Sequence, residues 1–246
     1  MEHTGYILLS RMAAVMRGTD VLATNIANAE TPGFRAARAV FATRLQEQRD
    51  VATPTGGRPV AYVQDRATWR DTTQGGLSTT GNPLDVAIQG EGYFAVETPR
   101  GERFTRAGRF TLGAEGRLQD LEGHAVLDAR GTPIAFAAGD SRIAILGDGT
   151  IRSENGVLGK LRVVRFSNDQ SLRAEGDRLY ASDEPPETIA RPAVVQGALE
   201  GSNVRPVLEM TRLTQEMRGF QTLAQFLETE GKRGGDAVAR ILGRAA

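Results

Sequence analysis

The sequence predicts an α+β fold, with paired long helices at the two ends of the chain and a β-rich, antiparallel domain between them. Apolar residues at both ends recur at alternating steps of three and four, the spacing that keeps one face of a helix apolar. Between the ends this period disappears, and short apolar runs alternate with glycine turns. A chain of 246 residues with 40% hydrophobic content is long enough to bury a core.

The first predicted helix covers residues 5–28. It ends where Thr31 precedes Pro32, because proline disfavours helical backbone in the residue before it, and Gly33 follows to take the turn geometry. The helix carries a seam of apolar or small residues that repeats in coiled-coil fashion. The seam residues are Leu8, Met12, Val15, Thr19, Leu22 and Ile26.

The second predicted helix begins near Val204, with Asn203 as a plausible N-cap and Pro206 in the first turn. Its seam consists of Met210, Leu213, Met217, Phe220, Ala224 and Leu227. Glycines at 231, 234 and 235 could end the helix, since each costs about 1 kcal/mol relative to alanine.

The seam nevertheless continues in phase across these glycines, through Gly231, Gly234, Val238 and Ile241. We therefore predict one helix to about Leu242, in which Gly231 and Gly234 allow close backbone approach to a neighbour. The alternative is a helix that ends at Glu230, followed by a loop and a short second helix.

The middle of the chain reads as strands. Runs at 85–89, 93–97, 104–112 and 158–166 are separated by turns such as Gly90-Glu91-Gly92. Turns at this close spacing favour antiparallel hairpins over βαβ units, which need a crossover of about a dozen residues. The sequence predicts a helical domain of residues 1–34 and 203–246, an extended linker at 35–79, a β-rich domain at 80–182 and a return linker at 183–202.

Composition argues against several functions. Thirty Lys plus Arg balance thirty Asp plus Glu, so no net charge attracts nucleic acid or an anionic membrane. The absence of cysteine excludes disulfides and thiolate metal sites, and His3 and His124 alone cannot make a zinc site. We expect no membrane insertion, because no segment approaches roughly 18 consecutive apolar residues, and the start of the chain lacks the basic region of a cleaved signal peptide.

The chemical motifs are weak. Residues 90–95 fit a loose dinucleotide fingerprint, but the run continues as a strand where a nucleotide site needs a helix. We expect no catalytic residue, no cofactor and no metal, and hence no enzyme.

Four ordered motifs resemble those of the flagellar basal-body rod and hook proteins. The first closes the first predicted helix, at residues 25–34, and the others lie at 80–94, 104–110 and 197–204. Within the first motif, the residues of the family turn are Asn25, Asn28, Thr31, Pro32, Gly33 and Phe34. The resemblance covers nearly the whole chain.

The resemblance implies a structural subunit of the flagellar rod, in the basal body, whose terminal helices line a tube with the β-rich domain outside it. Its partners would be copies of itself, other rod subunits and the flagellar type III export apparatus, which needs no cleaved signal. The short chain is unlike a hook subunit, and residues 60–71 resemble the proximal-rod members. The alternatives are a distal-rod subunit and a non-flagellar coiled-coil adaptor.

Overall fold

A computed structural model describes residues 2–48, 58–140, 142–176 and 178–243. The chain forms two compact units. The first, here called the helical unit, consists of Met1–Ala27, Ala37–Arg70 and Arg205–Ala246. The second, the β unit, consists of Asn28–Ala36 and Asp71–Val204.

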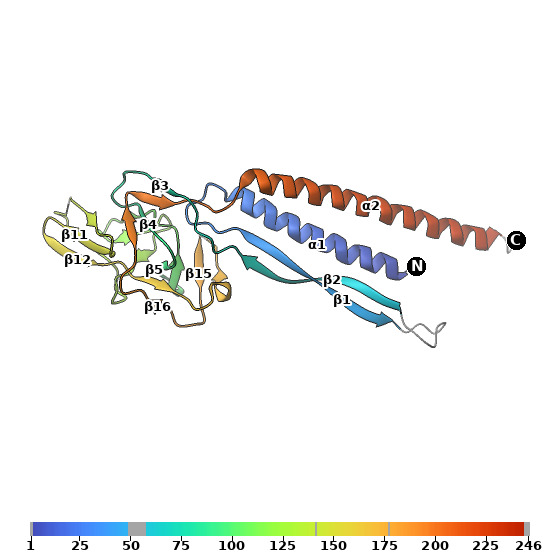
Figure 1. Ribbon diagram of the computed structural model, residues 1–246, viewed down its shortest axis with the longest axis horizontal. Helices are drawn as coiled ribbons and strands as arrows, with labels where there is room; N and C mark the ends of the chain where they lie inside the picture. Colours follow the sequence, from blue (N-terminus) through green and yellow to red (C-terminus); the bar gives the residue numbers. More distant parts are fainter. Residues whose placement is uncertain (1, 49–57, 141, 177, 244–246) are drawn as a thin grey trace. The chain divides into compact units, whose positions relative to one another are not determined.

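Two long helices dominate the helical unit. Helix α1 spans Glu2–Ala27 and helix α2 spans Pro206–Gly243; they lie side by side and run in opposite directions (Figure 1). Helix α2 is continuous through its glycines, which confirms the prediction of a single helix. A Cβ added at Gly231 or Gly234 would meet nothing within 4 Å, so neither residue is needed for packing within this subunit.

A long antiparallel hairpin completes the helical unit. Strand β1 (Ala37–Gln48) pairs with β2 (Arg58–Arg70) in a continuous register that shifts once, between Val40 and Phe41. Helix α1 packs against this hairpin as well as against α2, and it lies between them (Figure 1). The hairpin occupies much of the range 35–79, where the sequence predicts an extended linker. Turn-forming residues at 53–57 suggested that linker, but the strands pair from either side of them.

The β unit contains short strands that pair antiparallel, as predicted. Within the described residues, nine strands form one sheet, and the others make a three-stranded and two two-stranded sheets. The large sheet consists of β5 (Tyr93–Thr98), β6 (Gly101–Thr105), β7 (Thr111–Leu112), β8 (Leu118–Gln119), β9 (Ala125–Val126), β13 (Val163–Arg165), β14 (Arg173–Ala174), β15 (Leu179–Ala181) and β16 (Glu187–Thr188). The smaller sheets are β10 (Ala144–Ile145), β11 (Thr150–Ser153) and β12 (Gly156–Lys160); β4 (Val86–Ile88) with β17 (Val194–Gln196); and β3 (Leu77–Thr79) with β18 (Ala198–Glu200). One 3-10 helix, η1, spans Asp169–Ser171.

The core of the β unit lies at strand β5, whose side chains are buried on both faces of the sheet. Phe94 and Val96 belong to one apolar cluster, and Tyr93 belongs to a second. Tyr93 contacts the rings of Phe166 and Tyr180 edge to face, with centroids 5.9 and 5.7 Å apart. Burial on both faces explains why this strand reads as an unbroken apolar run rather than as an alternating one.

The turn after α1 belongs to the β unit and depends on Gly33. Its φ is +71°, and its amide donates to the carbonyl of Glu200 at 2.8 Å. A Cβ at this position would lie 2.5 Å from the amide nitrogen of Ala107. Both the left-handed backbone and the close approach require glycine.

The N-cap predicted at Asn203 is wrong. Helix α2 begins at Pro206, and the Asn203 side chain instead binds two distant backbone segments of the β unit, at residue 36 and at residues 71–73. Its Oδ1 accepts from the amide of Ala36 at 2.7 Å, and its Nδ2 donates to the carbonyls of Asp71 and Thr73, both at 2.9 Å. A side chain held by these distant segments cannot turn back to cap the helix that follows it.

Candidate assembly surface

The predicted seam of α1 is largely covered in the single subunit. Leu22 is buried, and Leu8, Met12, Val15 and Ile26 are half-buried. A second face of the same helix is covered too, including the buried residues Ala14, Val21 and Asn25. The sequence pattern missed this second face because it is specified by the hairpin, which the prediction lacked.

The covered stripe of α2 differs from the predicted seam by a small rotation. Of the predicted residues, Leu213, Phe220, Leu227 and Gly234 are half-buried, whereas Met210, Met217 and Gly231 are exposed. Val238 and Ile241 lie within α2, but their side chains fall outside the described residues. The covered stripe also contains Leu223 and Ala224, both half-buried, and three acidic residues: Glu209, Glu216 and Glu230. A search for apolar periodicity passes over such positions.

A buried carboxylate explains the rotation. Glu209 of α2 is 1% exposed, and its Oε2 accepts hydrogen bonds from Arg38 Nη1 of β1 at 2.6 Å and from Asn25 Nδ2 of α1 at 3.2 Å. Its Oε1 accepts from Arg212 Nη1 at 2.9 Å. Asn25 also holds the start of β1, because its amide accepts from the Ala37 backbone nitrogen and donates to the Ala37 oxygen, both at 2.9 Å.

These partners keep the carboxylate ionised. Burial alone would raise the pKa of Glu209, but hydrogen bonds from Arg38 and Asn25 and the charges of Arg38 and Arg212 outweigh burial and lower it. Asn25 is one of the residues of the family turn, so the structure gives that motif residue a role in positioning α1, β1 and α2.

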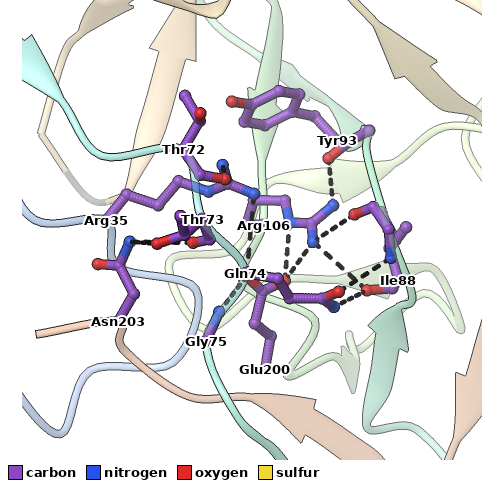
Figure 2. Close-up of polar contacts among 12 residues, drawn as sticks. Arg35, Thr72, Thr73, Gln74, Gly75, Ile88, Tyr93, Arg106, Glu200 and Asn203 are labelled. Carbon is purple, nitrogen blue, oxygen red and sulfur yellow. Dashed lines mark hydrogen bonds and ion pairs between the residues drawn. The ribbon is translucent and has the colours of Figure 1, made fainter.

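A second buried polar network lies within the β unit. Arg106 is 1% exposed; its Nε donates to Glu200 Oε2 at 2.7 Å, and its two Nη groups donate to the carbonyls of Gly92 at 2.6 Å and Gly90 at 2.9 Å (Figure 2). Arg35, from the turn after α1, faces the other oxygen of Glu200 at 3.9 Å and donates to the carbonyl of Thr72. The network therefore connects the turn after α1 with β18 and with the loop between β4 and β5.

The helical unit leaves large apolar side chains in solvent. On α1, Tyr6, Leu9 and Met16 are 62%, 52% and 58% exposed, and on α2 Val207 and Phe226 are 76% and 48% exposed. A groove of about 420 Å³ runs between the helices and is lined by Met16, Thr19, Asp20, Met217, Phe220 and Gln221. Exposed apolar side chains in such number, on a helix already covered on two faces, are typical of an interaction surface.

Other kinds of site find no support in the part of the chain that the structure describes. No group of three or more His, Asp or Glu side chains there could hold a metal ion. None of its helices combines the length and the apolar character needed to cross a bilayer.

The fold and this surface define a class: a structural protein whose helical unit exposes apolar side chains suited to assembly. Three family models match the chain in order. They describe a flagella basal body rod protein at residues 6–35, the D1 domain of the flagellar hook protein FlgE/F/G at 87–153, and the C-terminal part of the flagellar basal body rod FlgEFG protein at 195–235.

Relatives match over nearly their whole length. The flagellar basal-body rod proteins FlgF of Mesorhizobium japonicum and Caulobacter vibrioides are 34% and 33% identical, over 98% of this chain and of each relative. The rod protein FlgG of Agrobacterium fabrum is 34% identical over 91% of this chain and 93% of its own. The chain belongs to the flagellar basal-body rod protein family, and it is a structural subunit of the rod in the basal body.

Proposed function

We propose that the chain polymerises through its helical unit, so that copies of it and other rod subunits build a tubular drive shaft. The observation that carries the proposal is the exposed apolar face of α1, formed by Tyr6, Leu9 and Met16. Burial of such side chains against a neighbour contributes roughly 25 cal/mol per Å² of apolar surface to the free energy of association. A single subunit lacks this contribution.

The half-buried seam and the exposed side chains of the two helices take different parts in this assembly. The half-buried seam, including Leu8, Met12, Leu213 and Phe220, packs within the subunit in the manner of a coiled coil. The residues exposed beside it, such as Met16 and Met217, contact the next subunit. A contact between two different faces whose rotation does not close into a ring produces an open helical assembly.

The end of α2 supplies a second contact. Helix α2 has 38 residues and α1 has 26, so at 1.5 Å per residue α2 is about 18 Å longer. Gly231 and Gly234 face open space near this end. They would let the backbone of a neighbouring helix approach closely, as small residues do at tight helix contacts.

The subunit's place in the rod is proposed from its relatives. FlgF proteins match over 92–98% of the chain at 33–36% identity, which favours the FlgF-like, proximal-rod position that residues 60–71 suggested. The FlgG match keeps a distal-rod position as the competing assignment. We also propose export by the flagellar type III apparatus without a cleaved signal, and a solely structural role without enzymatic activity or nucleic-acid binding.

The decisive experiment introduces a charge into the exposed face. Met16→Glu and Leu9→Glu should abolish rod assembly, because a carboxylate would be buried without a partner in each contact between subunits. Both side chains are exposed in the single subunit, so its own fold should survive. Arg11→Glu is the matched control, since Arg11 is exposed on the same helix and the site already carries a charge.

The readouts are motility of cells that carry only the variant and recovery of the chain in purified basal bodies. Circular dichroism of the purified subunit checks its fold. Normal rods in the Met16→Glu strain would refute assembly through this face.

A further inference from the structure

The helical unit has two buried polar side chains among its described residues, and they contact each other. Asn25 is 0% exposed and Glu209 is 1% exposed, and the Asn25 amide donates to the Glu209 carboxylate at 3.2 Å. The other buried residues of the described helical unit are Ala14, Val21 and Leu22. A buried polar pair in a helical unit whose other buried residues are aliphatic costs desolvation, which calls for an explanation beyond stability.

The apolar seam does not define one alignment of the helices. It repeats every seven residues, so sliding α2 by one heptad exchanges one apolar or small residue for another. On α1 the repeat includes Leu8, Val15 and Leu22. On α2 it includes Leu213, Phe220 and Leu227, and in parallel Met210, Met217, Ala224 and Gly231. Leucine and methionine adapt to such exchanges at small cost.

The polar contacts, in contrast, are complete in only one alignment. Asn25 is fixed to β1 by its two hydrogen bonds with the Ala37 backbone, and the next residue, Arg38, reaches the same carboxylate of Glu209. Sliding α2 by one heptad would bring Glu216 to the place of Glu209. Glu216 would then lack the second cationic partner that Glu209 has, because Gly219 would stand in the place of Arg212.

We propose that the contact of Asn25 with Glu209, completed by Arg38 and Arg212, sets the axial register of α2 against α1 and β1. Its role is specificity: it selects one alignment among several that the apolar seam accepts. A single buried polar group fixes register in coiled coils in the same way. The alignment of Met16 with Met217 on the exposed surface is then a consequence of this contact, and its importance for assembly rests on the proposed function.

The chain contains no cysteine, so pairs of introduced cysteines report register without interference. Met16 and Met217 line the same groove, and Met16→Cys with Met217→Cys therefore reports the native alignment. Ala23 lies seven residues after Met16 and is exposed, so Ala23→Cys with Met217→Cys reports the alignment in which Glu216 replaces Glu209. Each pair is placed in the full-length chain, oxidised at low protein concentration and scored for intramolecular disulfide.

The informative variant replaces the polar pair with apolar side chains, Asn25→Leu with Glu209→Leu. Replacing both partners with leucine removes their selectivity, at a cost in stability from the Ala37 backbone groups and Arg38, which lose their hydrogen-bond partners. We expect helix content to be retained and the ratio of native to slipped disulfide to fall by roughly tenfold, which corresponds to about 1.4 kcal/mol. Glu216→Gln removes the carboxylate that would replace Glu209 in the slipped alignment, so the ratio of native to slipped disulfide should stay the same or rise, and it should not fall.

An unchanged ratio in the Leu/Leu variant would overturn the proposal. If that variant loses its helices, Glu209→Gln decides, because glutamine keeps the size of the side chain but not the charge that Arg38 and Arg212 recognise. A fall in its ratio supports the register role, and an unchanged ratio overturns it. All of these measurements use single subunits, so a failure of rod assembly through the helices would not affect their outcome.

Discussion

Among single residues, Gly33 carries the most restrictive local geometry. Its backbone is left-handed, and its Cα lies against the backbone of Arg106 and Ala107. Gly81 has a similar φ, +76°, but a Cβ added there would meet nothing within 4 Å. The two positions therefore separate the cost of backbone strain from the cost of steric overlap.

Gly33→Ala should destabilise the β unit more than Gly81→Ala does. We expect about 1 kcal/mol for Gly81→Ala, from strain alone, and about 3 kcal/mol for Gly33→Ala, where neighbouring backbone must also move. Hydrogen exchange of strands β5 and β6 at increasing urea concentration measures both. Equal effects would show that the close approach to Ala107 adds nothing.

The buried carboxylate of Glu209 makes the helical unit sensitive to acid. Its pKa is lowered in the folded state, so the contribution of ionised Glu209 to folding is complete above the ordinary glutamate pKa and is lost as the pH falls through the lowered folded value. We expect helix content to become less stable to heat below about pH 4.5. A hydrogen bond to a charged group of this kind contributes about 2 kcal/mol to the free energy of unfolding.

Glu209→Gln tests whether the acid sensitivity comes from the Glu209 carboxylate. The variant should be less stable at neutral pH, and the acid-dependent loss should be smaller than in the parent. Thermal unfolding by far-UV circular dichroism at a series of pH values measures both effects. An equally steep acid loss in the variant would assign the pH dependence to other carboxylates.

Among the elements, α2 combines a continuous helix with glycines that pack against nothing in the subunit. Gly231→Leu and Gly234→Leu should raise the helix content of the single subunit, because each removes a helix penalty of about 1 kcal/mol. The same changes should reduce incorporation into rods if neighbours approach the helix at these positions.

The control for this prediction is Gly231→Ala, which gives a similar gain in helix propensity with a far smaller side chain. Incorporation into basal bodies and helix content of the free subunit are measured for each variant. Full incorporation of the leucine variants would exclude a close contact at Gly231 and Gly234.

At the scale of the whole molecule, burial is unevenly distributed. The β unit has two apolar clusters with many side chains at or near 0% exposure. Among its described residues, the helical unit buries only five: Ala14, Val21, Leu22 and Asn25 of α1, and Glu209 of α2. Opening of a region costs less where fewer side chains are buried.

Hydrogen exchange of a dilute subunit should therefore show three levels of protection. We expect slow exchange in strands β5 and β6, intermediate exchange at 14–26 and 209–224, and fast exchange at 5–10 and 228–243. Assembly should slow exchange most in the last group. Uniform strong protection of both helices in the dilute subunit would contradict this order.

The two terminal helices, the antiparallel strands of the middle and the family all follow from the sequence alone. The seven-residue repeat predicts both terminal helices, and its phase across Gly231 and Gly234 predicts that α2 continues, since periodicity is a property of neighbouring residues. Closely spaced glycine turns likewise predict antiparallel strands in the middle. Motifs that resemble the rod proteins complete this part of the prediction.

Which polar residues are buried, and which segments they join, depends on how distant parts of the chain pack together. The Asn25 and Glu209 side chains meet across 184 residues of sequence, and the hairpin of β1 and β2 is needed to bring Arg38 to them. Asn203 lost its predicted role as a cap for the same reason, because partners distant in sequence engage its side chain. Periodicity records which face of a helix is apolar, but the partner of a buried charge is set by the packing of distant segments.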